Sequence, residues 1–218
     1  MAHTDTPAPL QQILNQGGIW QARQAPETPL TPARSSGYAQ VDEQLPAGGW
    51  QPGQLCEIYS QGLGQGDLSL LSPVLAELSQ QPRWLLLIAP PVLPYAPALE
   101  MLGIHSERLL MVHPKNDKEA LWCMEEGLRS GHCSAVLGWI AHPPAAAIRR
   151  LQVACEESQG HAWLWPGAQP NSAGSPAPLR VQVSRQDARH SRVTFIKRRG
   201  RWPGQPFTLP LQQPTLSS

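Results

Sequence analysis

The stretch LCEIYSQGLGQGDLSLLSPVLAELSQ, residues 55–80, decides the fold class. It begins with mostly apolar residues typical of a strand, passes through a turn with three glycines, and continues with apolar residues at helical spacing. A second apolar run, WLLLIA at residues 84–89, is typical of a strand buried on both faces. This order of strand, glycine-rich turn, helix and strand predicts a βαβ unit and hence a parallel sheet.

The same alternation continues along the chain. We expect helices at residues 10–23, 67–80, 94–102, 116–130 and 145–157, and strands at residues 55–60, 84–89, 109–113, 135–140 and 161–165. Residues 179–184 and 192–197 alternate apolar and polar side chains, which predicts an antiparallel hairpin with one solvated face. The sequence therefore predicts an α/β fold with a largely parallel twisted sheet, flanking helices and a C-terminal antiparallel hairpin.

The composition separates a core from two tails. The chain has 218 residues, of which 24 are proline and 18 glycine, and these gather outside the periodic segments. We expect an N-terminal helix and proline-rich linker at residues 1–36, a core at 37–200 and a proline-rich extended tail at 201–218. No apolar run approaches the about 18 residues that cross a bilayer. The N-terminus shows no secretion signal, so we expect a cytoplasmic protein without membrane contact.

The pattern of cysteines and histidines predicts no metal site. Cys56, Cys123, Cys133 and Cys155 stand far apart, without a C-x-x-C pair, and the seven histidines form no helical i, i+4 pair. We expect all four thiols to be reduced in the cytosol. No Ser-His-Asp or Cys-His set can be argued from residue order. The sequence therefore predicts no catalytic residues, no cofactor and no metal.

The glycine-rich turn after the first strand has the frame of a phosphate site without its chemistry. A dinucleotide fingerprint needs G-x-G-x-x-G and a later acid, whereas the turn reads G-x-G-x-G and no acid follows the second strand. The P-loop positions for glycine, glycine, lysine and hydroxyl are occupied by Ser60, Gln65, Gly66 and Asp67. A carboxylate at Asp67 would offset the about 0.3–1 kcal/mol by which a helix N-terminus favours anions. We therefore expect Asp67 to be a helix N-cap and the turn to be a degenerate P-loop.

Residues 37–140 resemble the core of the RecA ATPase. The shared segments are LPAGGW at 45–50, PG at 52–53, EIY at 57–59, LGI at 102–104, EAL at 119–121 and LRSG at 128–131. RVTFIKRR at 192–199 resembles the lysine-bearing strand with which RecA protomers meet a neighbour's nucleotide. The Walker B acid is missing from residues 136–140, and Pro90 and Pro91 stand where the family has its catalytic glutamate. The resemblance therefore implies a RecA-like pseudo-ATPase rather than an enzyme.

Two RecA-related families without an active site are similar to this chain. The ImuA family shares IWQARQ at 19–24, LPAGGWQPG at 45–53, RW at 83–84, IAPP at 88–91, PYAPAL at 94–99, SPAPLR at 175–180 and KRRG at 197–200. The SulA family is similar over about residues 66–184, notably at QPRW (81–84), LRSG (128–131) and AVLGW (135–139). SulA proteins generally lack the segment at 45–59 and the strand at 197–199. These two segments favour ImuA.

The two resemblances imply different partners. An ImuA-like protein would be a non-catalytic accessory of SOS-induced translesion DNA synthesis. It would bridge the polymerase-like subunit ImuB, an error-prone DnaE-type polymerase and RecA. A SulA-like protein would be an SOS cell-division inhibitor that binds FtsZ and blocks its polymerisation. A third hypothesis is a surviving ATPase that uses unrecognised residues.

Basic residues are concentrated near the C-terminus. Eight of the 17 lysines and arginines lie between Arg180 and Arg201, against one acid, Asp187. Candidate partner-binding residues are Trp20, Arg192, Lys197, Arg198, Arg199, Arg201 and Trp202. The basic cluster could meet an acidic partner, touch DNA phosphate or be a solvated strand end. Residues 166–178 contain no lysine or arginine, so we expect DNA contact to be indirect or weak. For Trp139, Trp163 and Trp165 we favour core packing.

Overall fold

The computed structural model describes residues 31–167 and 174–210. The expected helix at residues 10–23 and the candidate residue Trp20 lie outside the described residues. The chain divides into two units, Met1–Thr31 and Pro32–Ser218, and every element described below belongs to the second.

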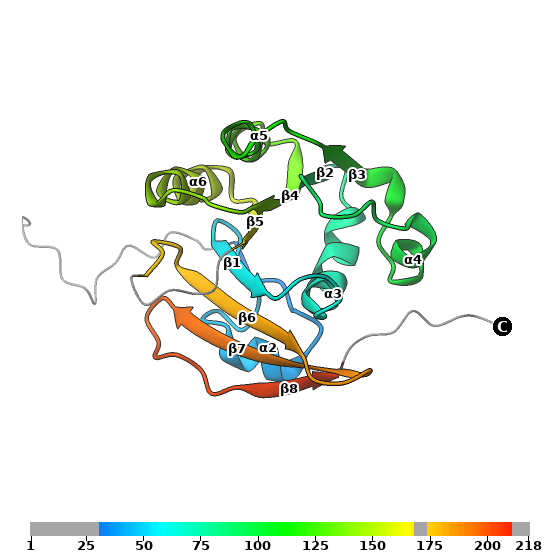
Figure 1. Cartoon of the computed structure of the whole chain (residues 1–218), viewed down its shortest axis with the longest axis vertical. Coiled ribbons are helices and arrows are strands. Elements are labelled where there is room, and N and C mark those ends of the chain that lie inside the picture. The colour runs from blue at the N-terminus through cyan, green and yellow to red at the C-terminus, as the bar shows by residue number, and fades with distance from the viewer. Residues whose placement is uncertain (1–30, 168–173, 211–218) are drawn as a thin grey trace, which may run out of the picture. The chain divides into compact units, whose positions relative to one another are not determined.

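One eight-stranded sheet organises the described chain, in the order β3-β2-β4-β5-β1-β6-β7-β8 (Figure 1). The strands are β1 (Leu55–Ser60), β2 (Trp84–Ile88), β3 (Leu109–Val112), β4 (Cys133–Ile140), β5 (His161–Pro166), β6 (Leu179–Arg185), β7 (His190–Arg198) and β8 (Phe207–Pro210). Neighbouring strands from β3 to β6 run parallel, whereas β6, β7 and β8 pair antiparallel. The predicted α/β class, with a mostly parallel sheet and antiparallel C-terminal strands, is confirmed.

Helices cover both faces of this sheet. They are α2 (Ala39–Gln44), α3 (Asp67–Ser79), α4 (Ala96–Met101), α5 (Asp117–Arg129) and α6 (Ala145–Ser158), with a single 3-10 turn, η1, at Ser106–Arg108. Buried side chains of α2, α3 and α4 share one core cluster with one face of the sheet, and those of α5 and α6 form a second cluster on the other face. Apolar residues on both faces explain why β2 and β4 read as continuous apolar runs.

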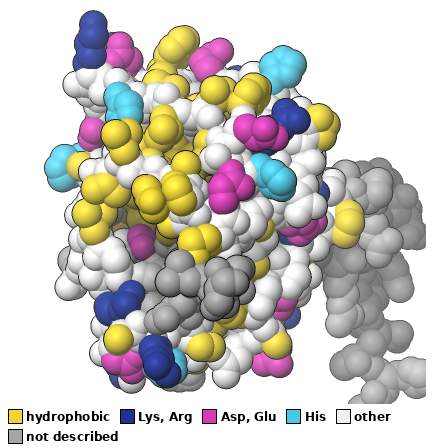
Figure 2. All heavy atoms as spheres, turned by 90° about the vertical axis from the view of Figure 1, so that its right-hand side faces the viewer, with side chains coloured by type: hydrophobic (Ala, Val, Ile, Leu, Met, Phe, Trp, Pro, Cys, Tyr) yellow, Lys and Arg dark blue, Asp and Glu magenta, His cyan; other side chains and the backbone are white. Residues whose placement is uncertain are grey.

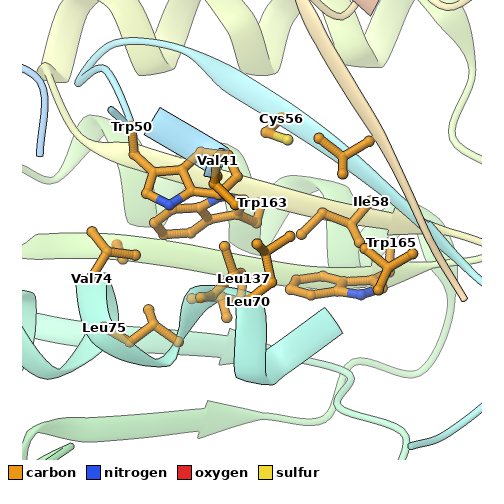
Figure 3. Packing of buried hydrophobic residues seen from close by; sticks show 14 of the residues in the cluster. Val41, Trp50, Cys56, Ile58, Leu70, Val74, Leu75, Leu137, Trp163 and Trp165 are labelled. Atoms are coloured by element: carbon orange, nitrogen blue, oxygen red, sulfur yellow. The ribbon is translucent and has the colours of Figure 1, made fainter. Parts of the chain in front are cut away.

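Tryptophans fill the first of these clusters, as expected for Trp163 and Trp165. Trp163 is 1% exposed and meets Trp50 edge to face, with ring centroids 5.8 Å apart (Figure 3). Trp165 is 5% exposed and stacks on Trp139 at 4.5 Å, because β4 and β5 place these two residues in register. Two indoles near the ends of neighbouring strands thereby line the same edge of the sheet.

Two features were not predicted from the sequence. The short helix α2 is held by Asp42, whose carboxylate accepts hydrogen bonds from Ser35 Oγ at 2.6 Å and from the backbone N–H of Ser36 at 2.8 Å. Strand β8 pairs with β7 and buries Leu209, although its sequence reads as part of a proline-rich tail. Within the described residues, no helix has the length and apolar character needed to cross a membrane.

Candidate functional site

A cavity of about 590 Å³ opens at the carboxyl edge of the parallel strands. It is bounded by the loop after β1, the first turns of α3, the loop after β2 and the ends of β4 and β5. Ligands of open α/β sheets bind at this edge, because the loops that leave the strands converge there. On the side of the molecule where α4 lies, Figure 2 shows hydrophobic side chains gathered around a hollow. The cavity is therefore the first candidate for a functional site.

The walls of the cavity are mainly apolar. Leu75 of α3, Leu87 of β2 and Leu137 of β4 reach it from the core, and the stacked indoles of Trp139 and Trp165 form another side. Nucleotide sites need a metal and several charged groups around the phosphates. This lining has the apolar character of a surface that takes hydrophobic ligands or side chains.

The degenerate P-loop lies at the mouth of this cavity, and Asp67 is its central residue. Asp67 Oδ2 accepts a hydrogen bond from Ser60 Oγ at 2.8 Å and another from Trp165 Nε1 at 2.7 Å. Ser60, Gly66 and Asp67, three of the residues at the predicted P-loop positions, all line the cavity. A carboxylate with its own donors occupies the start of α3, where a phosphate-binding loop presents lysine and hydroxyl groups.

The expectation that Asp67 is the N-cap of α3 was wrong. Gly66 is the N-cap, and Asp67 is the first residue of the helix. No side chain caps the start of the helix. Gly66 has a φ of +88°, in the left-handed region that glycine adopts without steric cost. The helix therefore begins one residue earlier than an N-cap at Asp67 would place it. The Asp67 side chain is left to point toward β1 and β5.

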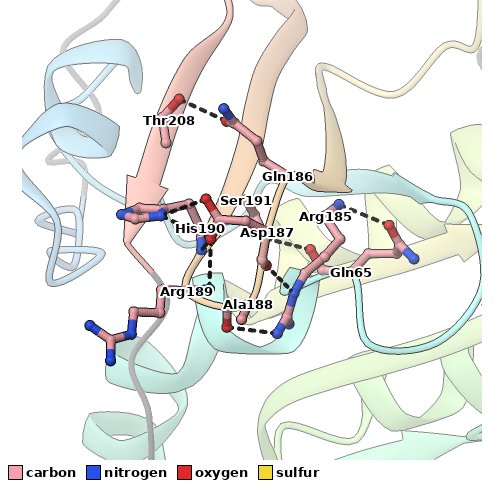
Figure 4. Close-up of polar contacts among 9 residues, drawn as sticks. All are labelled: Gln65, Arg185, Gln186, Asp187, Ala188, Arg189, His190, Ser191 and Thr208. Carbon is pink, nitrogen blue, oxygen red and sulfur yellow. Dashed lines mark hydrogen bonds and ion pairs between the residues drawn. The ribbon is translucent and has the colours of Figure 1, made fainter.

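Gln65 joins this loop to the turn between β6 and β7 (Figure 4). Its side-chain Oε1 accepts from the backbone N–H of Arg185 at 2.8 Å, and its carbonyl accepts from Ser191 Oγ at 2.6 Å. Arg185 Nη1 also donates to the carbonyl of Gly64 at 3.1 Å. The lip of the cavity is therefore fixed by the C-terminal strands, which the sequence pattern did not indicate.

The predicted basic cluster divides into inward-facing and outward-facing residues. Lys197 Nζ donates to the carbonyl of Ser175 at 2.9 Å, and burial together with the nearby Arg180 lowers the Lys197 pKa. The Arg198 guanidinium donates to Gln44 and to the carbonyl of Trp202. These two cations are used within the protein, so they do not form part of an open basic surface.

The remaining candidates are exposed, on β7 and on the turn that follows it. Arg199 lies 3.9 Å from Glu156, and Arg201 donates to the carbonyl of Glu43 at 3.0 Å. Trp202 is 89% exposed, the highest fraction among the large hydrophobic residues described. Arg192 points to solvent from β7. Arg199, Arg201 and Trp202 therefore lie together at the β7–β8 turn, whereas Arg192 lies near the start of β7, next to Ser191.

Sequence reasoning missed a buried polar cluster centred on Glu57. Arg180 Nε lies 3.3 Å from Glu57 Oε2, and both residues are buried. Glu57 also accepts from Tyr59 at 2.8 Å and from Ser175 at 2.7 Å. Burial, followed by the charge of Glu57, raises the pKa of Tyr59 to about 12. In the sequence, the one sign of this cluster was an acid within the apolar strand β1. Two of its partners, Ser175 and Arg180, lie more than 100 residues away in the chain.

Potential metal ligands and thiols in the described part of the chain show no site of their own. No group of three or more His, Cys, Asp or Glu in residues 31–167 and 174–210 is arranged to hold a metal ion. All four cysteines are free. Burial raises the pKa of the Cys56 thiol and raises that of Cys155 to about 12. Raised pKa values disfavour the thiolate, which is the reactive form of cysteine.

Comparisons with known proteins identify relatives for this arrangement. Residues 55–163, half of the chain, match the sequence model of the family "Cell division inhibitor SulA". SulA of Pseudomonas aeruginosa is 35% identical over 121 residues, which cover 55% of this chain and 75% of that protein. The crystal structure of that SulA is 33% identical, has a TM-score of 0.44 and matches over 51% of this chain and 96% of its own.

Two further relatives, an ImuA and another SulA, match segments of different lengths. Protein ImuA of Caulobacter vibrioides is 28% identical over 135 residues, which cover 60% of this chain and 55% of that protein. SulA of Edwardsiella piscicida is 37% identical over 84 residues, 38% of this chain and 49% of that protein. With half of its length matched by the family model and similarity to ImuA besides, this chain belongs to the SulA family and is related to ImuA.

Proposed function

We propose that this chain is a non-catalytic accessory protein of SOS-induced translesion DNA synthesis, of the ImuA type. It joins an ImuB-like polymerase subunit to an error-prone DnaE-type polymerase and to RecA. The observation that carries this proposal is the extent of the sheet beyond the matched SulA segment. Strands β6, β7 and β8 lie outside residues 55–163, yet they complete the sheet and fix the loop after β1.

The proposal includes a RecA-like core that has lost its nucleotide chemistry. Asp67 occupies the P-loop position of the hydroxyl residue, and β4 ends in Trp139 and Ile140 rather than in an acid. Pro90 and Pro91 follow β2. These replacements remove the groups that would hold Mg²⁺ and outer phosphates. Calorimetry with millimolar MgATP is expected to show no binding heat. A saturable heat would support a surviving ATPase instead.

Co-purification tests the assembly directly. The tagged chain, co-expressed with an ImuB-like polymerase subunit, is expected to retain that subunit through gel filtration. A deletion strain is expected to lose damage-induced mutagenesis and to recover it when the gene is restored. Normal mutagenesis in the deletion strain would overturn the proposal.

The exposed β7–β8 turn gives a sharper form of this test. Replacing Arg199 and Arg201 by glutamate and Trp202 by alanine reverses the charge of the turn and removes its indole, and all three residues are exposed. If the turn meets an acidic partner, the triple variant loses co-purification, whereas Trp122→Ala, an exposed control on α5, does not. If it touches DNA instead, binding to an oligonucleotide would fall steeply with salt and with the same triple variant.

A SulA-type division inhibitor is the second candidate, because residues 55–163 match the SulA family model and one SulA is 35% identical over 121 residues. That function would require the chain to bind FtsZ and block its polymerisation. Overproduction in a host with normal division is the discriminating experiment. We expect no filamentation and unchanged FtsZ assembly in a sedimentation assay. Filamentation with loss of sedimentable FtsZ would favour the second candidate.

A further inference from the structure

The cavity at the carboxyl edge has an unbalanced charge. Asp67 and Arg185 are the charged residues among those described as lining it. The Arg185 guanidinium donates to the carbonyls of Gly64, Asp187 and Ala188, at 3.1, 2.6 and 2.9 Å. It therefore faces the β6–β7 turn, and no ion pair joins it to Asp67 among the described residues. The carboxylate lacks a cation of its own.

Asp67 retains hydrogen-bonding capacity toward a ligand. Both of its described hydrogen bonds, from Ser60 and Trp165, end on Oδ2. Oδ1 has no hydrogen-bond partner within residues 31–167 and 174–210. A carboxylate oxygen accepts its strongest hydrogen bonds from ammonium or guanidinium donors. The electrostatic complement of this position is a cation, and a phosphate would be repelled from it.

The surfaces beside Asp67 suit a cation with a long apolar stem. The stacked pair Trp139 and Trp165 offers aromatic surface, which attracts lysine and arginine head groups as well as apolar chains. Around the mouth, Leu63, Val92 and Leu93 are 60%, 53% and 72% exposed. Exposed apolar residues that gather in one patch can mark a protein-binding surface.

We propose that this pocket binds a lysine or arginine side chain of a protein partner, inserted from a segment whose flanking residues are apolar. The cationic head meets Asp67 Oδ1, the stem lies along the indoles of Trp139 and Trp165, and the flanking residues contact the loops after β1 and β2. The inference rests on the proposed function, since it treats the pocket as a partner site rather than a nucleotide site. It explains why a carboxylate stands in a mainly apolar pocket.

Three probes of equal chain length test the charge preference on the whole protein: n-hexylguanidinium, n-hexanol and hexanoate. Titration followed by ¹H–¹⁵N NMR is expected to shift the indole N–H signal of Trp165 and the amide signals of residues 62–69. The affinity is expected to fall from the guanidinium to the alcohol to the carboxylate. The advantage of the cation over the alcohol is expected to be about tenfold. Equal affinities, or shifts elsewhere, would overturn the proposal.

Asp67→Asn separates charge from shape. Asparagine can still accept from Ser60 and Trp165 but carries no charge, so the variant is expected to lose most of the preference for the guanidinium over the alcohol. Trp139→Leu is expected to weaken guanidinium binding while Asp67 stays intact. Glu126→Gln, an exposed acid on α5, is the matched control and is expected to change nothing. Thermal unfolding of each variant checks that the fold is kept. A cation preference that is undiminished in Asp67→Asn would refute the role of this carboxylate.

The outcome is distinguishable from that of the proposed function, because the titration contains no partner protein. If the probes bind as expected and co-purification fails, the cation site stands and the assembly is wrong. If co-purification succeeds and Asp67→Asn leaves it unchanged, the partner uses another surface and the inference is overturned.

Discussion

His161 is a buried histidine at the start of β5, 3% exposed and stacked on Trp163 with ring centroids 5.6 Å apart. Its Nε2 has no hydrogen-bond partner among the described residues. Burial, aided by the charges of Arg34 and Arg83, lowers its pKa to about 3. The unfolded chain binds a proton at this position below about pH 6.5, whereas the folded chain remains neutral there. The stability that depends on neutral His161 is therefore present above pH 6.5 and lost as the pH falls.

We predict that acidification destabilises the fold through this residue. Between pH 6.5 and pH 5, His161 contributes a loss of about 1.4 kcal/mol per pH unit to the free energy of unfolding. Urea denaturation at pH 7.5, 6 and 5 measures it. His161→Phe keeps the ring stack and is expected to flatten this dependence, while His113→Gln at an exposed site is not. Identical pH profiles for the native chain and His161→Phe would contradict the assignment.

The buried pair of Glu57 and Arg180 makes a second prediction at the residue scale. Arg180→Met leaves Glu57 buried without its cation and is expected to cost about 3–5 kcal/mol of unfolding free energy, measured by urea denaturation. Arg199→Ala, at the exposed 3.9 Å contact with Glu156, is expected to cost less than about 0.5 kcal/mol. Similar costs for the two variants would show that burial does not decide the strength of this pair.

At the scale of one element, α5 shows how local sequence sets a boundary. Asn116 Oδ1 accepts from the backbone N–H of Glu119 at 3.0 Å, and Glu119 in turn accepts from the backbone N–H of Lys115 at 2.6 Å. These contacts satisfy donors that a helix start leaves unpaired. Asn116→Ala is expected to lower the free energy of unfolding by about 1 kcal/mol, and Asn116→Ser by less, in urea titrations. An unchanged midpoint for Asn116→Ala would contradict the cap.

Helix α3 depends instead on contacts from elsewhere in the chain. Pro73 interrupts it and leaves the carbonyl of Ser69 without its helical donor. Tyr38 and Ser72 hydroxyls donate to that carbonyl at 3.1 and 2.9 Å. The apolar spacing of residues 67–79 was enough to predict the helix. The contribution of Tyr38 could not be predicted, because it lies 31 residues away.

At the scale of the whole molecule, β1 lies between β5 and β6 in the middle of the sheet. A chain that stops after Gly167 would keep the SulA-matched segment but lose β6, β7 and β8. It would leave the edge of β1 unpaired and Glu57 without Arg180. We predict that this truncated chain aggregates or unfolds without cooperativity, because bare apolar edges promote association. Gel filtration and urea denaturation measure this. A monomer with the full-length midpoint would contradict it.

The sequence by itself determined the α/β class, the nine strands and helices predicted between residues 55 and 165, the C-terminal hairpin and the absence of P-loop residues around Asp67. These follow from hydrophobic periodicity and from residue types at fixed spacing, which are local properties. Tertiary structure alone decided that Asp67 meets Trp165, that Arg185 and Ser191 hold the glycine loop, that Lys197 and Arg198 turn inward, and that residues 207–210 complete the sheet. Each of these depends on strands that meet across long stretches of chain, and no local pattern encodes which side chains then face one another.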